Sequence, residues 1–441
     1  MFLRQFNKQL LSLALIFILA PDFAFGQNDS ISIKKPFIDA TDLRIVIRGK
    51  KKMKDETGIP EQGKLMAFAA PLIGSNPTLG FFYGLGGTGA IYLGNPETTN
   101  VSSANVSVMY TTNKQLITSV KGTIMTPDNG WEMLVDVRYS DYTENTYGLG
   151  SDYDQPINDS WNIGGIETTG NTGGQPLEFQ QVKLYYTALK EISNKLYAGL
   201  GYNLDWHYDI KDLSLDLEAE NPVITSHYAY STKFGFDPTE SLSSAITANI
   251  LLDSRDHTVN AYSGTYLHAS YRLNPKFLGN ENDYQQIYLE ARYFKPLSIL
   301  RSRHILGFWG IGQFNFDGHA PYMHLPSSAN DTRNRIGRGY VAGRFRGPSW
   351  VTGEAEWRFP LTKNGLLGGV VFGNATTVSR EEITIGEETV EKLNLFEAVR
   401  PAGGFGLRVL LNRTGRLNLG LDMAWGDNGA KGFYFVVGET F

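Results

Sequence analysis

The sequence predicts an all-β protein, namely a 16-stranded antiparallel transmembrane β-barrel. Apolar and polar residues alternate through most of the chain after residue 64, and the predicted connections are long on one side only. After the N-terminus, no apolar run approaches the roughly 18 residues that a membrane-spanning helix requires. A closed barrel satisfies the backbone hydrogen bonds of every strand inside a bilayer, which an open sheet does not.

The chain begins with a predicted secretory signal over residues 1–26. Arg4 and Lys8 supply positive charge ahead of the apolar block Leu10–Ala20, and small residues up to Gly26 suit a cleavage site. The alternative is a short buried helix at the start of a cytosolic domain. The signal predicts that the mature chain leaves the cytoplasm.

Two further regions follow the signal. Residues 27–63 are predicted to be a periplasmic tether, and residues 64–441 are predicted to form the outer-membrane barrel. The run Lys50–Lys54 in the tether is interpreted as a solvated linker, with a binding site as the alternative.

Alternation with a period of two defines the strands. In one of them, Trp357 and Phe359 share a face, while Glu354, Glu356 and Arg358 lie on the opposite face. Helical spacing is not sustained anywhere, so almost no helix is predicted. The predicted strands span residues 65–74, 77–93, 102–113, 115–127, 129–143, 176–191, 194–210, 243–254, 262–274, 283–295, 302–316, 350–361, 366–379, 400–412, 415–426 and 432–441.

The lengths of the connections predict the orientation of the barrel. Short periplasmic turns and long extracellular loops are typical of barrels in the outer membrane of Gram-negative bacteria, and an even strand count places both termini in the periplasm. A secreted β-propeller or β-sandwich is the alternative fold, but neither has a physical reason to segregate long loops. The long connections span residues 144–175, 211–242, 317–349 and 380–399.

The charged face of each strand is predicted to face the lumen. If it faced lipid, Glu354, Glu356 and Arg358 would lie in hydrocarbon, where an arginine at the midplane costs roughly 2–4 kcal/mol. A polar lumen avoids that cost. Lumen carboxylates such as Glu132 and Asp136 are therefore interpreted as parts of charge-balancing ladders, with a hydrolytic pair as the alternative.

Composition excludes several classes of function. The chain has no cysteine, so it has neither disulfides nor a thiolate metal site, and its net charge of −5 lacks the basic excess of a nucleic-acid-binding surface. His319 and His324 share a loop, but their spacing does not predict a metal site. We predict no enzyme activity, no cofactor, no metal, no nucleic-acid partner and no small-molecule substrate.

Several motifs resemble one known family. Residues 336–341 read IGRGYV and are followed by EAEWRFPL at residues 354–361, while DSRDH stands at residues 253–257. The segment 432–441 ends in an aromatic residue and is similar to a closing strand. Together these segments resemble the bacterial surface antigen family, that is, the BamA/TamA-type superfamily of outer-membrane barrels.

The resemblance implies that the sixth outer loop folds into the lumen. There Arg338 would pair with Glu356, Gly339 would allow a tight turn and Tyr340 would pack on the inner wall. The family's usual second partner is an aspartate, but Asn374 stands at that position and would leave the arginine one acceptor without charge. The alternative is that Arg338 is an ordinary solvated loop residue.

The seam of the barrel is predicted between the first and last strands. Pro71 lies in the first strand and cannot donate a ladder hydrogen bond, while Gly438 and Phe441 lie in the last strand. The hypothesis is a short closure that can part laterally. The alternative is that the first strand merely starts or bends at Pro71.

The resemblance also implies a function. Such barrels insert or translocate proteins, usually with periplasmic polypeptide-transport-associated (POTRA) domains, for which residues 27–63 have too little length. We therefore expect a barrel without POTRA domains that contacts outer-membrane lipid and works with periplasmic or outer-membrane protein partners. The alternatives are a solute channel and a non-transporting structural subunit of an outer-membrane complex.

Overall fold

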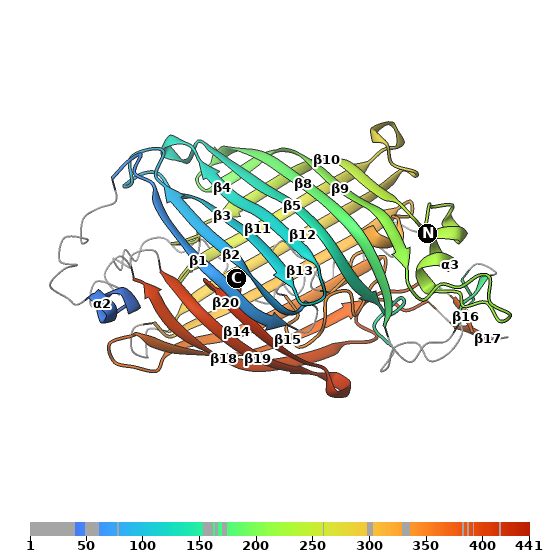
Figure 1. Cartoon of the computed structure of the whole chain (residues 1–441). Coiled ribbons are helices and arrows are strands. Elements are labelled where there is room, and N and C mark those ends of the chain that lie inside the picture. The colour runs from blue at the N-terminus through green and yellow to red at the C-terminus, as the bar shows by residue number, and fades with distance from the viewer. Residues whose placement is uncertain are drawn as a thin grey trace. The chain divides into compact units, whose positions relative to one another are not determined.

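Sixteen strands of the computed structural model form a single sheet, in which each strand pairs antiparallel with the next one in chain order (Figure 1). The sheet wraps into a barrel that brings β1 and β20 side by side, with no ladder between them in the described part of the chain. The wall consists of β1 (Met66–Asn76), β2 (Gly80–Ile91), β3 (Ser102–Thr111), β4 (Leu116–Met125), β5 (Trp131–Thr146), β8 (Gln175–Ser193), β9 (Leu196–Asp212), β10 (Ser241–Asp253), β11 (Gly264–Asn274), β12 (Tyr284–Pro296), β13 (Ile305–Asp317), β14 (Ser349–Pro360), β15 (Leu367–Val378), β18 (Arg400–Asn412), β19 (Leu417–Gly426) and β20 (Lys431–Val437).

The described residues belong to one compact unit, Phe37–Phe441. The predicted signal lies outside them, and only parts of the predicted tether lie within them. Among the described residues, no helix is long and apolar enough to cross a membrane. The structure describes residues 40–48, 61–76, 79–152, 162–163, 166–169, 174–258, 260–297, 303–328, 336–381, 383–385, 388–390, 392–413 and 416–441.

The predicted barrel is confirmed, and each predicted strand overlaps one strand of the wall. The end of the last strand is where the prediction differs most from the structure. The sequence predicts this strand over residues 432–441, but β20 ends at Val437 because Gly438 adopts a φ of 89° and turns the chain off the sheet. Glycine adopts such a φ without steric cost.

Strand length varies around the wall. On one side β8 has 19 residues and β9 has 17, whereas β20 has only seven and its neighbour β1 has eleven. The wall is therefore lowest where β20 lies.

Within the described residues, the prediction of almost no helix missed two short helices. Helix α3 (Ser226–Phe234) lies in a long loop, where the Thr225 hydroxyl caps its N-terminus by accepting from the backbone N–H of Tyr228 at 3.3 Å. Gly235 ends it in the left-handed conformation, with a φ of 72°. Both are local signals that do not depend on a sustained period.

Helix α2 (Leu43–Arg48) packs against the start of the turn that follows β18. The buried Asp42 carboxylate accepts hydrogen bonds from the backbone N–H groups of Ile45 and Arg413, each at 2.9 Å. Arg44 donates to Asn412 at 2.9 Å. These contacts hold the segment at the end of the barrel that carries the short turns.

The long loops carry further short strands and a single-turn helix. A four-stranded sheet combines β6 (Asn162–Ile163) and β7 (Ile166–Glu167) with β16 (Ile383–Ile385) and β17 (Glu388–Val390) from another loop. The single-turn helix η4 (Tyr322–His324) lies in the sixth loop. Other single turns are η2 (Pro127–Asn129), η3 (Lys276–Leu278) and η5 (Asp427–Gly429).

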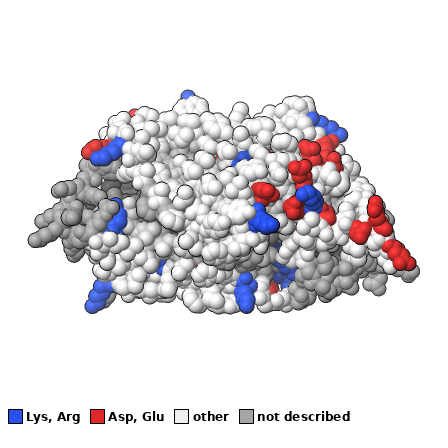
Figure 2. Space-filling model, viewed as in Figure 1, with Lys and Arg blue, Asp and Glu red and all other residues white. Residues whose placement is uncertain are grey.

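The outer face suits a lipid environment. Exposed aromatic side chains lie near both ends of the wall, for example Trp131 and Trp357 near the short turns and Tyr110 and Trp425 near the long loops. Figure 2 shows a face largely free of charged residues, with most Asp and Glu atoms at the end where Figure 1 places α3. The charges along the strands instead face the lumen, as the alternation predicts.

Candidate functional site: charges and tail in the lumen

The tip of the sixth loop lies against the inner wall of the barrel. Arg338 is only 2% exposed, and its Nη2 donates to Glu354 at 2.5 Å and to Glu356 at 2.8 Å, both on β14. Its Nη1 donates to Asp422 on β19 at 2.5 Å, and its guanidinium stacks on the Phe372 ring with its carbon 3.4 Å from the ring centroid. One planar cation thus joins two strands of the wall that are far apart in sequence.

The arrangement places Arg338 beside Glu356, as the resemblance implies, and adds two partners that sequence reasoning missed. Glu354 and Asp422 face the lumen by alternation, but many other carboxylates do so as well. Alternation gives the face of a residue, whereas the choice of partner depends on how the strands of the closed barrel are arranged around the loop.

Asn374 does not act as predicted. Its Nδ2 donates to the main-chain oxygen of Arg338 at 2.8 Å, so the amide holds the loop backbone rather than accepting from the guanidinium. The negative charge that an aspartate at this position would have supplied comes instead from Glu354 and Asp422.

Gly339 and Tyr340 fix the turn beside Arg338. Gly339 has a φ of 116°, its N–H donates to the Tyr434 hydroxyl at 2.9 Å, and a Cβ would lie 2.7 Å from the Cβ of Ala402. The Tyr340 hydroxyl donates to the Pro401 carbonyl at 2.7 Å. The tip therefore packs against β18 and β20 as well as against β14.

Two further arginines, Arg358 and Arg408, extend this network of ion pairs toward the short turns. Glu356 accepts from Arg358 at 2.5 Å, and Arg358 lies 4.0 Å from Glu439. Glu439 accepts from Arg408 at 2.9 Å, and Arg408 also donates to Asp422. Opposite charges thus alternate around a closed circuit, the lumen charge ring, which consists of Arg338, Glu356, Arg358, Glu439, Arg408 and Asp422.

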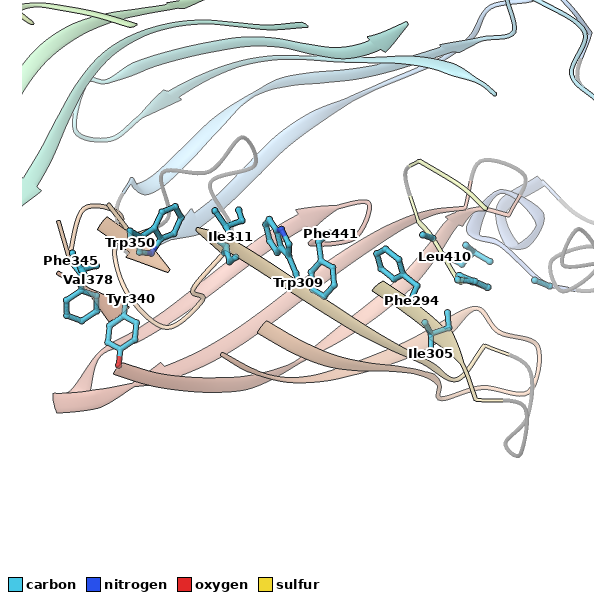
Figure 3. Close-up of a cluster of buried hydrophobic side chains, with 14 residues drawn as sticks. Phe294, Ile305, Trp309, Ile311, Tyr340, Phe345, Trp350, Val378, Leu410 and Phe441 are labelled. Atoms are coloured by element: carbon cyan, nitrogen blue, oxygen red, sulfur yellow. The ribbon is translucent and has the colours of Figure 1, made fainter. Parts of the chain in front are cut away.

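The tail, Gly438–Phe441, is buried in the lumen rather than paired at the seam, and this corrects the predicted place of Phe441. The Phe441 ring lies 5.7 Å from Phe294 and 5.2 Å from Trp309 between ring centroids (Figure 3). Arg358 donates to the main-chain oxygen of Phe441 at 2.8 Å. The tail therefore joins the lumen charge ring through Glu439 and an aromatic cluster through Phe441.

Pro71 lies in the middle of β1, opposite Leu85 of β2, and the pairing runs without a register shift from Met66 to Asn76. The alternative in which the strand starts at Pro71 is therefore wrong. Lateral parting of the seam between the first and last strands remains a prediction.

A second aromatic cluster lies at the end of the barrel that carries the long loops. Tyr322 and Tyr230 pack edge to face with centroids 5.5 Å apart, and Tyr230 donates to the Ala320 carbonyl at 3.0 Å. His324 is buried against His207 at 4.8 Å between ring centroids. Burial lowers the pKa of His324 to about 4, so this side chain is neutral at pH 7.

Among the described residues, no group of three or more His, Asp or Glu side chains is arranged to hold a metal ion. His319 stacks on Phe234 with ring centroids 4.0 Å apart, and His324 packs on His207. The two loop histidines thus have separate packing partners.

Comparison with known proteins finds similar solved structures. The chain is similar to BamA from Haemophilus ducreyi lacking POTRA domains 1–3, with 14% identity, a TM-score of 0.49 and coverage of 86% of this chain and 70% of that one. It is also similar to CdiB from Acinetobacter baumannii, with 13% identity, a TM-score of 0.46 and coverage of 85% of this chain and 59% of that one. No curated protein matches the sequence.

A family model described as the Omp85 superfamily domain matches residues 82–441. This range includes the loop tip, the lumen charge ring and the tail, and it confirms the resemblance predicted from the motifs. Because the match covers most of the chain, the protein belongs to the Omp85 superfamily of outer-membrane β-barrels.

Proposed function

We propose that this barrel helps to insert or translocate polypeptides at the outer membrane, together with protein partners. Omp85 membership supports a role of this kind in general. The observation that carries the proposal is the turn of the chain at Gly438, which takes the tail away from β1 and leaves β20 four residues shorter than its neighbour. Part of the β1 edge is then free to pair with a strand of another polypeptide.

The bilayer strengthens this argument. Backbone N–H and C=O groups that lack partners in hydrocarbon cost several kcal/mol each, so an edge inside the membrane favours pairing with any strand that arrives. An incoming polypeptide strand would satisfy both its own backbone groups and those of β1.

The orientation is part of the proposal. The long loops would be extracellular, both termini would lie in the periplasm, and residues 27–63 would tether the barrel there. A separate periplasmic protein would deliver the polypeptide. The contacts of Asp42 with Arg413 and of Arg44 with Asn412 support a tether whose middle part is fixed at that end of the barrel.

A disulfide across the seam tests the proposal, since the chain has no cysteine of its own. One cysteine is placed in β1 and one in β20, and insertion of an unfolded barrel protein into proteoliposomes is measured before and after oxidation. The matched control joins Leu85 and Val108, which face each other on β2 and β3. We expect oxidation to abolish insertion only across the seam, and full activity of the locked seam would refute the proposal.

A solute channel is the main alternative, and the segments that lie in the lumen argue against it. The sixth-loop tip, the tail and the aromatic cluster at the long-loop end all occupy the interior. Large, steady single-channel conductance of the purified barrel would favour the channel. Purification from native membranes with its partners separates an insertion role from that of a structural subunit.

A further inference from the structure

The residues around the tail form a binding site that is built for one kind of peptide segment. We call it the tail slot and define it by Phe294, Gly307, Trp309, Arg358, Arg408 and Asn418. We propose that the tail slot also binds, in exchange with the protein's own tail, a polypeptide segment in which an acidic residue stands two positions before an aromatic residue. The proposal deepens the proposed function and rests on it, because it names the class of segment that the barrel would take.

The aromatic part of the slot is specific in shape. Phe441 fits between Phe294 and Trp309, and the Arg358 guanidinium lies over its ring at 5.2 Å. A Cβ at Gly307 would stand 3.1 Å from the Phe441 ring, so the glycine makes room for it. A smaller side chain at the ligand position would leave this space unfilled.

The acidic part of the slot is equally defined. The Glu439 carboxylate accepts from Arg408 at 2.9 Å and also from Asn418, and it lies 4.0 Å from Arg358. Two arginines and an amide thus surround a single carboxylate. Without that carboxylate, the two cations would face each other across the slot with one fewer counter-charge.

The slot does not recognise the side chain of the residue between the acidic and the aromatic residue. Thr440 is 0% exposed, yet its hydroxyl has no hydrogen-bond partner in the structure. The slot therefore recognises the side chains at the first and third positions and requires only that the second be small enough to fit.

The tail could leave the slot by continuing strand β20, so that another segment could take its place. If Gly438–Phe441 continued the strand, β20 would span residues 431–441 and would have eleven residues, the same number as β1. Pairing with β1 would satisfy backbone groups at the edge, and the lumen site would then be empty. A cleft of about 50 Å³, lined in part by Arg358, Arg408 and Glu439, lies beside the tail.

Binding of the peptide Gly-Glu-Thr-Phe, labelled with a fluorophore at its N-terminus, tests the proposal on the full-length barrel in detergent. Phe441→Ala empties the aromatic part of the slot, so we expect this variant to bind the peptide at least tenfold more tightly than the natural sequence does. The peptides Gly-Gln-Thr-Phe and Gly-Glu-Thr-Ala should each bind at least tenfold more weakly. Folding is checked by the heat-dependent shift on gels.

A second pair of variants tests the location. Gly307→Leu, introduced together with Phe441→Ala, fills the aromatic part and should abolish binding. Gly310→Ala is the matched control, because a Cβ there would meet only the Thr352 carbonyl oxygen, at 3.9 Å. Equal binding in these two variants would place the peptide elsewhere and overturn the proposal.

Photo-crosslinking keeps the test decisive if the variants fail to fold. A peptide with benzoylphenylalanine at the aromatic position should cross-link the unaltered protein at Phe294 or Trp309, and excess unlabelled peptide should compete. Cross-links confined to other surfaces, or none at all, would overturn the proposal. If the barrel inserts proteins but does not bind the peptide, the tail slot alone is refuted. If the barrel binds the peptide but does not insert proteins, the proposed function is refuted.

Discussion

Arg358 donates to the main-chain oxygen of Phe441 at 2.8 Å, across 83 residues of sequence. The same guanidinium donates to Glu356, which in turn accepts from Arg338 at the tip of the sixth loop. A loop from one end of the barrel and a tail that enters from the wall are therefore held by one set of charges.

Removal of the loop arginine should destabilise the barrel strongly. Arg338→Ala leaves Glu354, Glu356 and Asp422 buried without their shared cation, and breaking a buried ion pair typically costs about 3–5 kcal/mol. Urea unfolding of the refolded barrel measures the loss. The control is Lys211→Ala, whose partner Glu178 is exposed and whose loss should change the free energy of unfolding little, because solvent screens exposed ion pairs. Equal, small effects in the two variants would contradict the role assigned to Arg338.

The loop tip and the tail should be energetically coupled. In a double-mutant cycle with Arg338→Met and Glu439→Gln, the two losses of unfolding free energy should fail to add by about 0.5–3 kcal/mol, because both residues belong to the lumen charge ring. Losses that add to within about 0.3 kcal/mol would show that the loop and the tail respond independently.

Restoring the aspartate that the family pattern places at residue 374 should weaken the barrel. Asn374→Asp removes the donor to the Arg338 carbonyl and places a new charge beside Glu354. We expect a loss of about 1–3 kcal/mol in unfolding free energy, the typical cost of an unpaired buried polar group. Asn374→Ala, which removes the donor without adding charge, separates the two causes. A more stable Asn374→Asp variant would instead support the partner role implied by the resemblance.

Acid should loosen the long-loop end of the barrel. Burial lowers the pKa of His324 to about 4, below the value near 6.5 of an exposed histidine, so the folded state binds this proton more weakly than the unfolded state. The contribution is complete above about pH 6.5 and is lost as the pH falls toward 4, by at most about 3 kcal/mol.

Protease cleavage of the long loops between pH 7 and 4.5 measures this effect. The protein with its natural sequence should become more sensitive as the pH falls, whereas His324→Gln, which cannot be protonated in this range, should show a smaller change. Parallel pH profiles for the two proteins would mean that other groups control the loops.

Much of the architecture could be predicted because alternation and loop length are properties of the local sequence. The same alternation predicts that Glu356 faces the lumen, where it meets Arg338. The partners Glu354 and Asp422 could not be selected, since their choice depends on how the closed wall sets the strands around the loop. The tail was misplaced because the residues after Gly438 suit a strand, and only the positive φ of that glycine marks the turn.

The shortness of β20 has a consequence for the surrounding lipid. At about 3.3 Å per residue and a tilt near 40°, seven residues rise roughly 18 Å, well below the roughly 30 Å of a typical hydrocarbon core. Lipids beside this strand must shorten or tilt to match it, at a cost that grows with each ångström of mismatch. The bilayer is therefore expected to be thinner beside β20 than beside the 19-residue β8.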